Sequence, residues 1–405
     1  MPQVNCLNCD MPATNGDVIR LWSTQIFVNS FVRLIELALV LFLFYILAMD
    51  RLMGKTPRGR GALSNEVGRF ERHARAAVDD GWDSDAPLPP LRTSVSEEVA
   101  RSLISYNRSP DLPFDRSINP YRGCEHGCVY CFARPSHAYL GLSPGLDFET
   151  RLIARPNAAE VLQREIAKPG YQVAPLAIGT NTDPYQPVER DRGIVRECLQ
   201  VLSGAGHPVA IVTKGSLIER DLDILAPMAK RGLLRVGISV TTLDAELARN
   251  MEPRVPSPAR RLNTIERLSR AGVPVRVMAS PMIPALTDPE LEAILQAGKA
   301  AGARTASWIM LRLPREVAPL VQEWLHEQMP DRAERVLARL REMHGGQLYD
   351  ARWHHRMRGT GHYAEMVAQR FELAVKRFGL KTAAPPMRTD LFRKPVMPNA
   401  QLSLF

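Results

Sequence analysis

The stretch NPYRGCEHGCVYC (119–131) decides the fold and the chemistry of this chain. It places Cys124, Cys128 and Cys131 at a C-x3-C-x2-C spacing, and thiolates this close together can bind one soft metal centre. A cubane [4Fe–4S] cluster takes four ligands, so three cysteines leave one iron open to a small molecule. The motif therefore predicts an iron–sulfur centre that binds and activates a ligand.

Two other interpretations of the cysteines stay open. A structural zinc site would need a fourth ligand, which His126 or His137 could supply. A disulfide is less favoured, because three cysteines leave one over and six cysteines in 405 residues are not a secreted disulfide scaffold. We expect a reducing compartment, hence a cytoplasmic protein. Cys6 and Cys9 form a lone C-x2-C pair, which is too weak a pattern to assign to a metal.

The charge is distributed unevenly along the chain. The formal net charge is +9, and the hydrophobic content of 45% is that of a folded globular protein. Residues 331–405 carry 14 Lys and Arg against 7 Asp and Glu, and residues 50–75 carry 7 against 3. Residues 76–330 are close to neutral, with 29 against 30. Basic flanks favour a polyanionic partner such as nucleic acid, although solvated helix faces would give the same pattern.

The N-terminal extension (1–53) contains the apolar run LIELALVLFLFYILAM at 34–49. A membrane anchor is one interpretation, with Arg51 and the basic residues after it on the cytoplasmic side. The other interpretation is a start codon further along the chain, at Met49 or Met53. No signal-peptide cleavage pattern is present.

The core (114–315) alternates short apolar runs with amphipathic stretches, which predicts parallel strands joined by crossover helices. Strands are expected at 115–119, 175–179, 208–213, 235–240, 274–279 and 306–311. Helices are expected at 157–167, 191–204, 218–231, 244–251, 258–272 and 288–302. Six such units are too few for a closed eight-stranded barrel. A lead-in (54–113) precedes them, basic and then rich in Pro and Asp, with one short helix expected from Glu97 to Ser105.

The cysteine motif, with aromatic Tyr130 before its last cysteine, resembles the signature of radical S-adenosylmethionine (SAM) enzymes. The resemblance implies an α/β fold, an open (β/α)6 partial TIM-like barrel. It also implies a [4Fe–4S] cluster whose open iron binds the methionyl group of SAM. Reductive cleavage then releases a 5′-deoxyadenosyl radical that abstracts hydrogen from a substrate. An electron donor such as flavodoxin or ferredoxin is implied as a partner.

The polar loops that follow the strands make the resemblance more specific, because they are similar to loops of one branch of the family. NTDPYQ, VTKG and SVTTLD are similar to loops of the family branch that contains spore photoproduct lyase. By motif position, the resemblance implies SAM contacts from Thr182, Lys214 and Ser239, with Tyr130 near the adenine. A lysine ammonium suits the methionyl carboxylate, and hydroxyls suit the ribose or the amine. Arg254 is a second candidate for the carboxylate, or else forms a surface ion pair.

One position departs from that branch. Thr180 stands where the lyase has a cysteine hydrogen donor, and an O–H bond is too strong for threonine to replace it. Cys198 lies in a helical stretch and is expected to be a buried apolar residue. Thymine-dimer repair by the same mechanism is therefore not expected. Our hypothesis is a lyase-like enzyme acting on damaged DNA or another nucleic acid. The alternatives are modification of RNA or protein, and an iron–sulfur sensor without turnover.

The C-terminal part divides into a basic helical region (316–384) and a flexible tail (385–405). The helical region mixes Arg, His and aromatic residues, which suits stacking on bases and binding of phosphates. The tail ends in a pentapeptide that resembles the motif by which bacterial proteins bind the DNA polymerase sliding clamp. Its expected anchors are Gln401, Leu402, Leu404 and Phe405.

Overall fold

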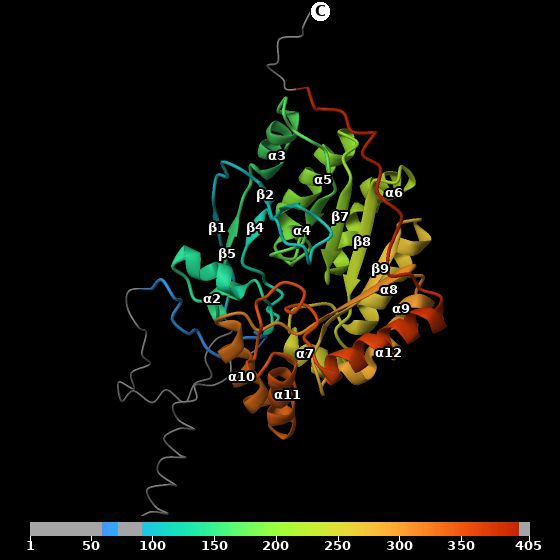
Figure 1. Cartoon of the computed structure of the whole chain (residues 1–405). Coiled ribbons are helices and arrows are strands. Elements are labelled where there is room, and N and C mark those ends of the chain that lie inside the picture. The colour runs from blue at the N-terminus through green and yellow to red at the C-terminus, as the bar shows by residue number, and fades with distance from the viewer. Residues whose placement is uncertain (1–58, 72–90, 397–405) are drawn as a thin grey trace, which may run out of the picture. The chain divides into compact units, whose positions relative to one another are not determined.

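The computed structural model describes residues 59–71 and 91–396, and a parallel sheet forms its centre (Figure 1). Six strands lie side by side in chain order: β3 (Arg116–Ile118), β6 (Leu176–Ile178), β7 (Val209–Thr213), β8 (Leu234–Ser239), β9 (Val275–Met282) and β10 (Thr305–Met310). β2 (Ile104–Tyr106) adds an antiparallel strand beside β3. The six predicted strands are confirmed, and their order is that of an open partial barrel.

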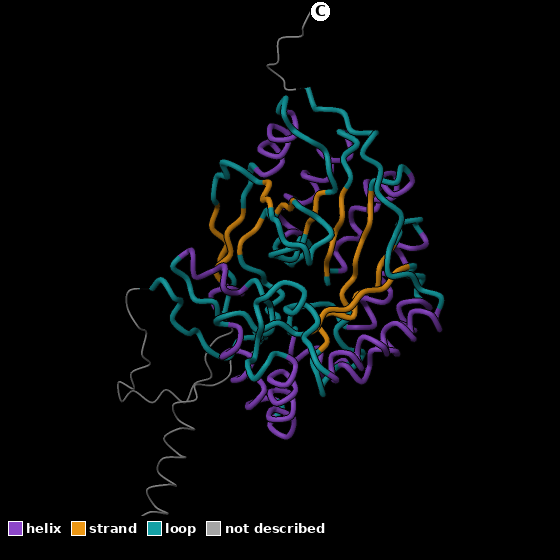
Figure 2. Tube along the Cα trace, in the orientation of Figure 1, coloured by secondary structure: helices purple, strands orange, loops and turns teal. Residues whose placement is uncertain are grey.

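Crossover helices cover the outer side of these strands. The longer ones are α3 (Ala158–Ala167), α5 (Ile194–Gly204), α6 (Leu222–Lys230), α8 (Pro258–Arg270) and α9 (Leu291–Ala300). Shorter ones are α2 (Leu146–Thr150), α4 (Glu189–Arg192) and α7 (Ala245–Met251), with 3-10 turns η1 (Arg134–Leu140), η2 (Ser216–Asp221) and η3 (Asp288–Glu290). The amphipathic helices bury one apolar face, as Val195, Leu199 and Leu202 of α5 show. Figure 2 shows helices and strands alternating along the trace.

The lead-in differs from its prediction, because no helix spans Glu97 to Ser105. Instead β1 (Ser94–Glu97) pairs in parallel with β5 (Arg151–Ala154), which also pairs with β4 (Tyr121–Arg122) in a separate three-stranded sheet. The predicted helical residues run from β1 to β2. Tertiary pairing decides this segment, since its short run of local preferences is weaker than two ladders of backbone hydrogen bonds.

The interior of the partial barrel is hollow because small residues point into it. Outward-facing Val209, Ile238 and Val277 are fully buried in the core between sheet and helices. On the inward face of neighbouring strands lie Ala210 and Gly237, where closed barrels carry bulky branched residues. A Cβ on Gly237 would lie 2.6 Å from the sulfur of Met278, so the glycine lets this side chain cross the lumen. A cavity of about 1900 Å³ results.

The chain after β10 forms three helices, α10 (Val317–Gln328), α11 (Pro330–Met343) and α12 (His362–Phe378), within the predicted helical region. A C-terminal strap (residues 381–396) follows. It crosses the ends at which the barrel strands begin: Lys381 forms a bridge with Thr305, and the backbone N–H of Arg388 donates to the Gly232 carbonyl at 3.0 Å. The strap therefore closes the end of the barrel at which the strands begin.

Several predictions fall outside the described residues. They concern the apolar run 34–49, the alternative starts at Met49 and Met53, the Cys6 and Cys9 pair, and the clamp-like residues Gln401, Leu402, Leu404 and Phe405. Among the described helices, none combines the length and the apolar character needed to cross a bilayer.

Candidate active site

The three cysteines lie on the loop between β4 and η1 and line one end of the cavity. Cys124 and Cys128 are buried, whereas Cys131 is partly exposed. Burial raises the pKa of Cys124, and the nearby Asp183, Cys128 and Cys131 raise it further. Burial also raises the pKa of Cys128, which the charge of Lys214 partly offsets. The thiols are therefore close enough to influence one another, and their thiolate forms need positive charge.

The donor set fits an iron–sulfur cluster. Thiolate sulfur is the ligand that such clusters take, and three thiols facing one cavity leave space for a further small ligand. In the described part of the chain, no three or more His, Cys, Asp and Glu side chains form a group that would hold a single ion. A cubane cluster does not require its cysteines to converge on a single ion, because each cysteine binds a different iron.

The two histidines of the zinc alternative have other partners. His126 Nδ1 lies 3.4 Å from the carboxylate of Asp183. His137 is fully buried, and its Nε2 contacts the Arg151 carbonyl at 3.0 Å. These contacts fix the orientation of both imidazole rings.

A buried carboxylate, Glu149, holds the cysteine loop from below. Fully buried, it forms an ion pair with Arg134, whose guanidinium also donates to the carbonyl of Cys128 at 2.9 Å. It accepts the backbone N–H groups of Gly61 and Ala62 at 3.0 and 2.8 Å. The N-terminal segment (residues 59–71) is thus part of the site's support. Sequence reasoning missed it, because one acid in an ordinary helical stretch gives no local signal.

Gly127 makes this packing possible. Its φ is +67°, and an added Cβ would lie 2.6 Å from the Glu149 carboxylate. Any side chain would meet both backbone strain and a clash with the buried acid.

The residues predicted to contact SAM gather around the same end of the cavity. Tyr130, Thr182, Lys214 and Ser239 all line it. The Lys214 ammonium lies 5.5 Å from the centroid of the Tyr130 ring, within the range of a cation–π contact. The hydroxyl of Thr182 donates to the Tyr121 carbonyl at 3.2 Å. The elements that bring these residues together are four different strand ends and loops.

Tyr130 is held by a buried polar network that the sequence did not reveal. Its hydroxyl hydrogen-bonds Glu252, which is also paired with Arg261 and accepts the hydroxyl of Thr241 at 2.9 Å. Burial raises the pKa of Glu252, although the charge of Arg261 opposes this. The network fixes the ring orientation. The only sequence signal was an acid and an arginine nine residues apart after a strand.

Lys214 is positioned through its backbone by Asp183. The carboxylate of Asp183 accepts the Lys214 N–H at 2.8 Å and the Thr213 hydroxyl at 2.5 Å. Burial alone would raise the pKa of Asp183, but the charge of His126 and these hydrogen bonds lower it to about 2. The acid is therefore ionised and couples the cysteine loop to the end of β7.

Arg254 forms an ion pair, which is the alternative to a SAM contact that the sequence left open. Its guanidinium pairs with Glu125 at 2.7 Å, remains 37% exposed, and is absent from the cavity lining. Thr180, the position of the missing cysteine, does line the cavity. Cys198 is fully buried in α5 among apolar residues, as expected.

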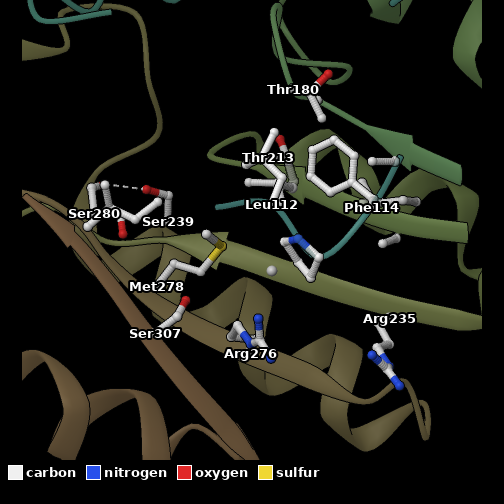
Figure 3. A pocket seen from close by; sticks show the side chains of 18 of the residues that line it. Leu112, Phe114, Thr180, Thr213, Arg235, Ser239, Arg276, Met278, Ser280 and Ser307 are labelled. Carbon is white, nitrogen blue, oxygen red and sulfur yellow. Dashed lines mark hydrogen bonds between the residues drawn. The ribbon is translucent and has the colours of Figure 1, made fainter. Parts of the chain in front are cut away.

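The interior of the cavity is strongly basic. Figure 3 shows Ser239 and Ser280 at one end of the view, with the Ser239 hydroxyl donating to the Ser280 carbonyl at 2.6 Å. Within residues 59–71 and 91–396, eleven lysine and arginine residues line the cavity against two acids, Asp111 and Asp183. Both acids are paired, the first with Arg356 at 2.6 Å and the second with His126. The basic residues include Arg235, Arg276, Arg304, Arg312, Arg356 and Arg358.

Comparison with known sequences gives two kinds of match. A model of the Radical SAM superfamily matches residues 118–297. A protein of Mycobacterium tuberculosis is 37% identical over 235 residues, covering 58% of this chain and 68% of the relative. A protein of Methanocaldococcus jannaschii is 25% identical over 173 residues, covering 43% of this chain and 62% of the relative.

Solved structures of spore photoproduct lyase resemble the fold. The lyase complexed with dinucleoside spore photoproduct matches with a TM-score of 0.51 at 14% identity, over 70% of this chain and 79% of the lyase. A mutant with bound AdoMet and the same dinucleoside matches over the same shares with a TM-score of 0.52 at 13% identity. At such low identity the likeness concerns the fold.

Proposed function

The chain belongs to the radical SAM superfamily, which uses a [4Fe–4S] cluster and SAM, and we propose that it removes hydrogen from a nucleic-acid substrate. We infer damaged DNA as that substrate. One observation carries the proposal: among the described residues, eleven lysines and arginines and two acids line the cavity that the three cysteines share, and both acids are paired.

Cys124, Cys128 and Cys131 would hold the cluster, and Lys214, Ser239, Thr182 and Tyr130 would hold SAM. When bound, the cluster supplies the electron that cleaves SAM to the 5′-deoxyadenosyl radical, which abstracts hydrogen from the substrate. The side chains do the rest of the work. The Lys214 ammonium offers charge to a carboxylate, and the Tyr130 ring, fixed by Glu252, offers a rigid flat surface.

The partial barrel encloses the reaction. The cavity lies inside six strands, and the C-terminal strap closes the end opposite the cysteines. A radical formed there is shielded from solvent and from stray hydrogen donors. The substrate must therefore enter at the cysteine end or through the open side of the barrel.

Basic and aromatic groups lie together at that end. Arg312 stacks over Phe132 at 4.0 Å, and Arg358 lies 5.6 Å from the Trp308 ring centroid. Burial lowers the pKa of Arg312. Its charge is therefore partly dehydrated, and attraction to an anion is stronger there than in bulk water. Such a mixture suits phosphates together with unstacked bases. The solved lyase complexes with a dinucleoside photoproduct support the same substrate class.

The hydrogen return step must differ from that of a cysteine donor. Thr180 occupies the corresponding position in the cavity, and among the described residues the cavity-lining cysteines are the three of the cluster motif. We therefore propose that the abstracted hydrogen is not returned by a thiol at this position.

The tail supplies a second proposal about partners. Gln401, Leu402, Leu404 and Phe405 form a clamp-like pentapeptide, and we propose that it tethers the enzyme to the sliding clamp at replicating DNA. Deleting residues 401–405 should abolish capture of the purified clamp while leaving SAM cleavage unchanged. Clamp capture by the truncated chain would remove this proposal.

The activity is tested with anaerobically reconstituted protein, SAM and dithionite. We expect 5′-deoxyadenosine to form, to increase with damaged DNA, and to vanish in Cys128→Ser. Stimulation by RNA or a protein extract but not by DNA would favour those substrates instead. Cluster reduction without 5′-deoxyadenosine would indicate a sensor.

DNA binding is tested separately with Arg312→Gln, against Arg190→Gln as the matched control. Arg312 lines the cavity, whereas Arg190 is exposed elsewhere. We expect the Arg312 variant to weaken binding and to reduce the slope of log affinity against log salt by about one. Equal effects of both substitutions would contradict a cavity-bound nucleic acid.

A further inference from the structure

Two arginines lie at the floor of the cavity, far from the cysteines. Arg235 is the second residue of β8 and Arg276 the second of β9, whereas Ser239 and Ser280 stand near the other ends of these strands. Figure 3 shows Ser239 and Ser280 at one end of the view and Arg235 at the other, with Met278 and then Arg276 between them. Four residues of strand separate Arg235 from Ser239, or about 13 Å.

Neither arginine has a carboxylate partner among the described residues. Arg235 donates to the Ala384 carbonyl at 3.3 Å. Arg276 donates to the Thr382 carbonyl at 3.2 Å and to the Thr305 hydroxyl at 3.4 Å. Each guanidinium has five N–H groups, so these long contacts leave most of its donors free.

The two charges also repel one another. Burial lowers the pKa of both groups, and the charge of Arg235 lowers that of Arg276 further. Two neighbouring cations that are partly shielded from water repel one another, and an anion between them relieves this repulsion. The two acids that line the cavity cannot serve, because Asp111 and Asp183 are paired with Arg356 and His126.

The register of the strands places the two arginines near each other. Arg276 is in register with Gly237, two residues beyond Arg235 on β8, and with Thr305 on β10. Ser307 is in register with Met278, which is in register with Ser239, so Ser307 lies nearer the cysteine end than either arginine. Two guanidinium forks suit a tetrahedral oxyanion, which accepts several hydrogen bonds at once.

We propose that Arg235 and Arg276 form an oxyanion site for phosphate at the end of the barrel where its strands begin, separate from the cluster and SAM site. The carbonyls of Thr382 and Ala384, from the C-terminal strap, accept some of the arginine N–H groups. The proposal does not depend on which substrate reacts at the cysteine end. The phosphate is either a free ion or the terminal group of a nucleotide that extends down the lumen.

The test is calorimetric titration of the cluster-containing full chain with inorganic phosphate, without SAM and at constant ionic strength. We expect saturable binding that weakens at least tenfold in Arg235→Gln and in Arg276→Gln, because each loses a charged fork. Arg190→Gln, an exposed arginine, should bind as the natural chain does. Absence of saturable binding below about 10 mM, or binding that none of the floor substitutions weakens, overturns the proposal.

A milder variant protects the test against misfolding. Arg276→Lys keeps the charge but loses the fork. It should weaken binding less than Arg276→Gln does, and unchanged affinity overturns the assignment. A second titration with thymidine 5′-monophosphate separates the sources. Tighter binding than phosphate, with the same arginine dependence, indicates a nucleotide's terminal phosphate, and equal binding indicates the free ion.

Discussion

Substituting Glu149→Gln tests how the cysteine loop is held. The carboxylate is fully buried, pairs with Arg134 and accepts two backbone N–H groups of the N-terminal segment. The amide keeps the shape but removes the charge, leaving Arg134 buried and unpaired. Breaking a buried pair from one side costs about 3–5 kcal/mol of unfolding free energy. An amide N–H₂ facing a backbone donor adds to that loss.

The matched control is Glu160→Gln, the same chemical change on α3. Glu160 faces solvent and lies 3.9 Å from the exposed Arg164. Its loss should cost no more than about 0.5 kcal/mol. Urea unfolding of the cluster-containing protein, followed by tryptophan fluorescence, measures both variants.

Local readouts accompany the unfolding curve. Loss of the Glu149 contacts frees residues 59–71 from the loop that carries Cys128, so cleavage there by a protease and iron release to a chelator should both accelerate. The argument is refuted if Glu149→Gln unfolds within about 1 kcal/mol of the natural chain and retains iron equally well.

Three further predictions follow from the site and the barrel floor. Lys214→Ala should weaken SAM binding at least tenfold by equilibrium dialysis, whereas Arg254→Ala, which only breaks a half-exposed pair, should change it less than threefold. Glu252→Gln should raise the KM for SAM and disturb Tyr130 fluorescence, and unchanged values of both would contradict its positioning role. His207 is buried two residues before β7, and burial lowers its pKa to about 4, so the folded state favours the neutral ring. Stability is then fully present above about pH 6.5 and falls by up to about 3 kcal/mol as pH drops to 4. His207→Gln should lose this part of the pH dependence in urea titrations, and an unaltered profile would exclude the assignment.

The sequence predicted the fold because its signals are local and periodic. Alternating apolar runs and amphipathic stretches fixed six parallel strands and their crossover helices. It did not predict β1 and β2, since a strand of three or four residues is decided by its partner rather than by its own composition.

The sequence by itself determined the chemistry, since three thiols within eight residues can meet at one centre on a single loop. Only the tertiary structure decided which distant groups serve them. It brought Gly61 under Gly127 through Glu149, turned Arg254 to Glu125 and away from the cavity, and set Arg235 beside Arg276. Such contacts join residues far apart in the chain. The energies of these contacts depend on how deeply the groups are buried and on how donors and acceptors are oriented. Neither property can be predicted from the sequence alone.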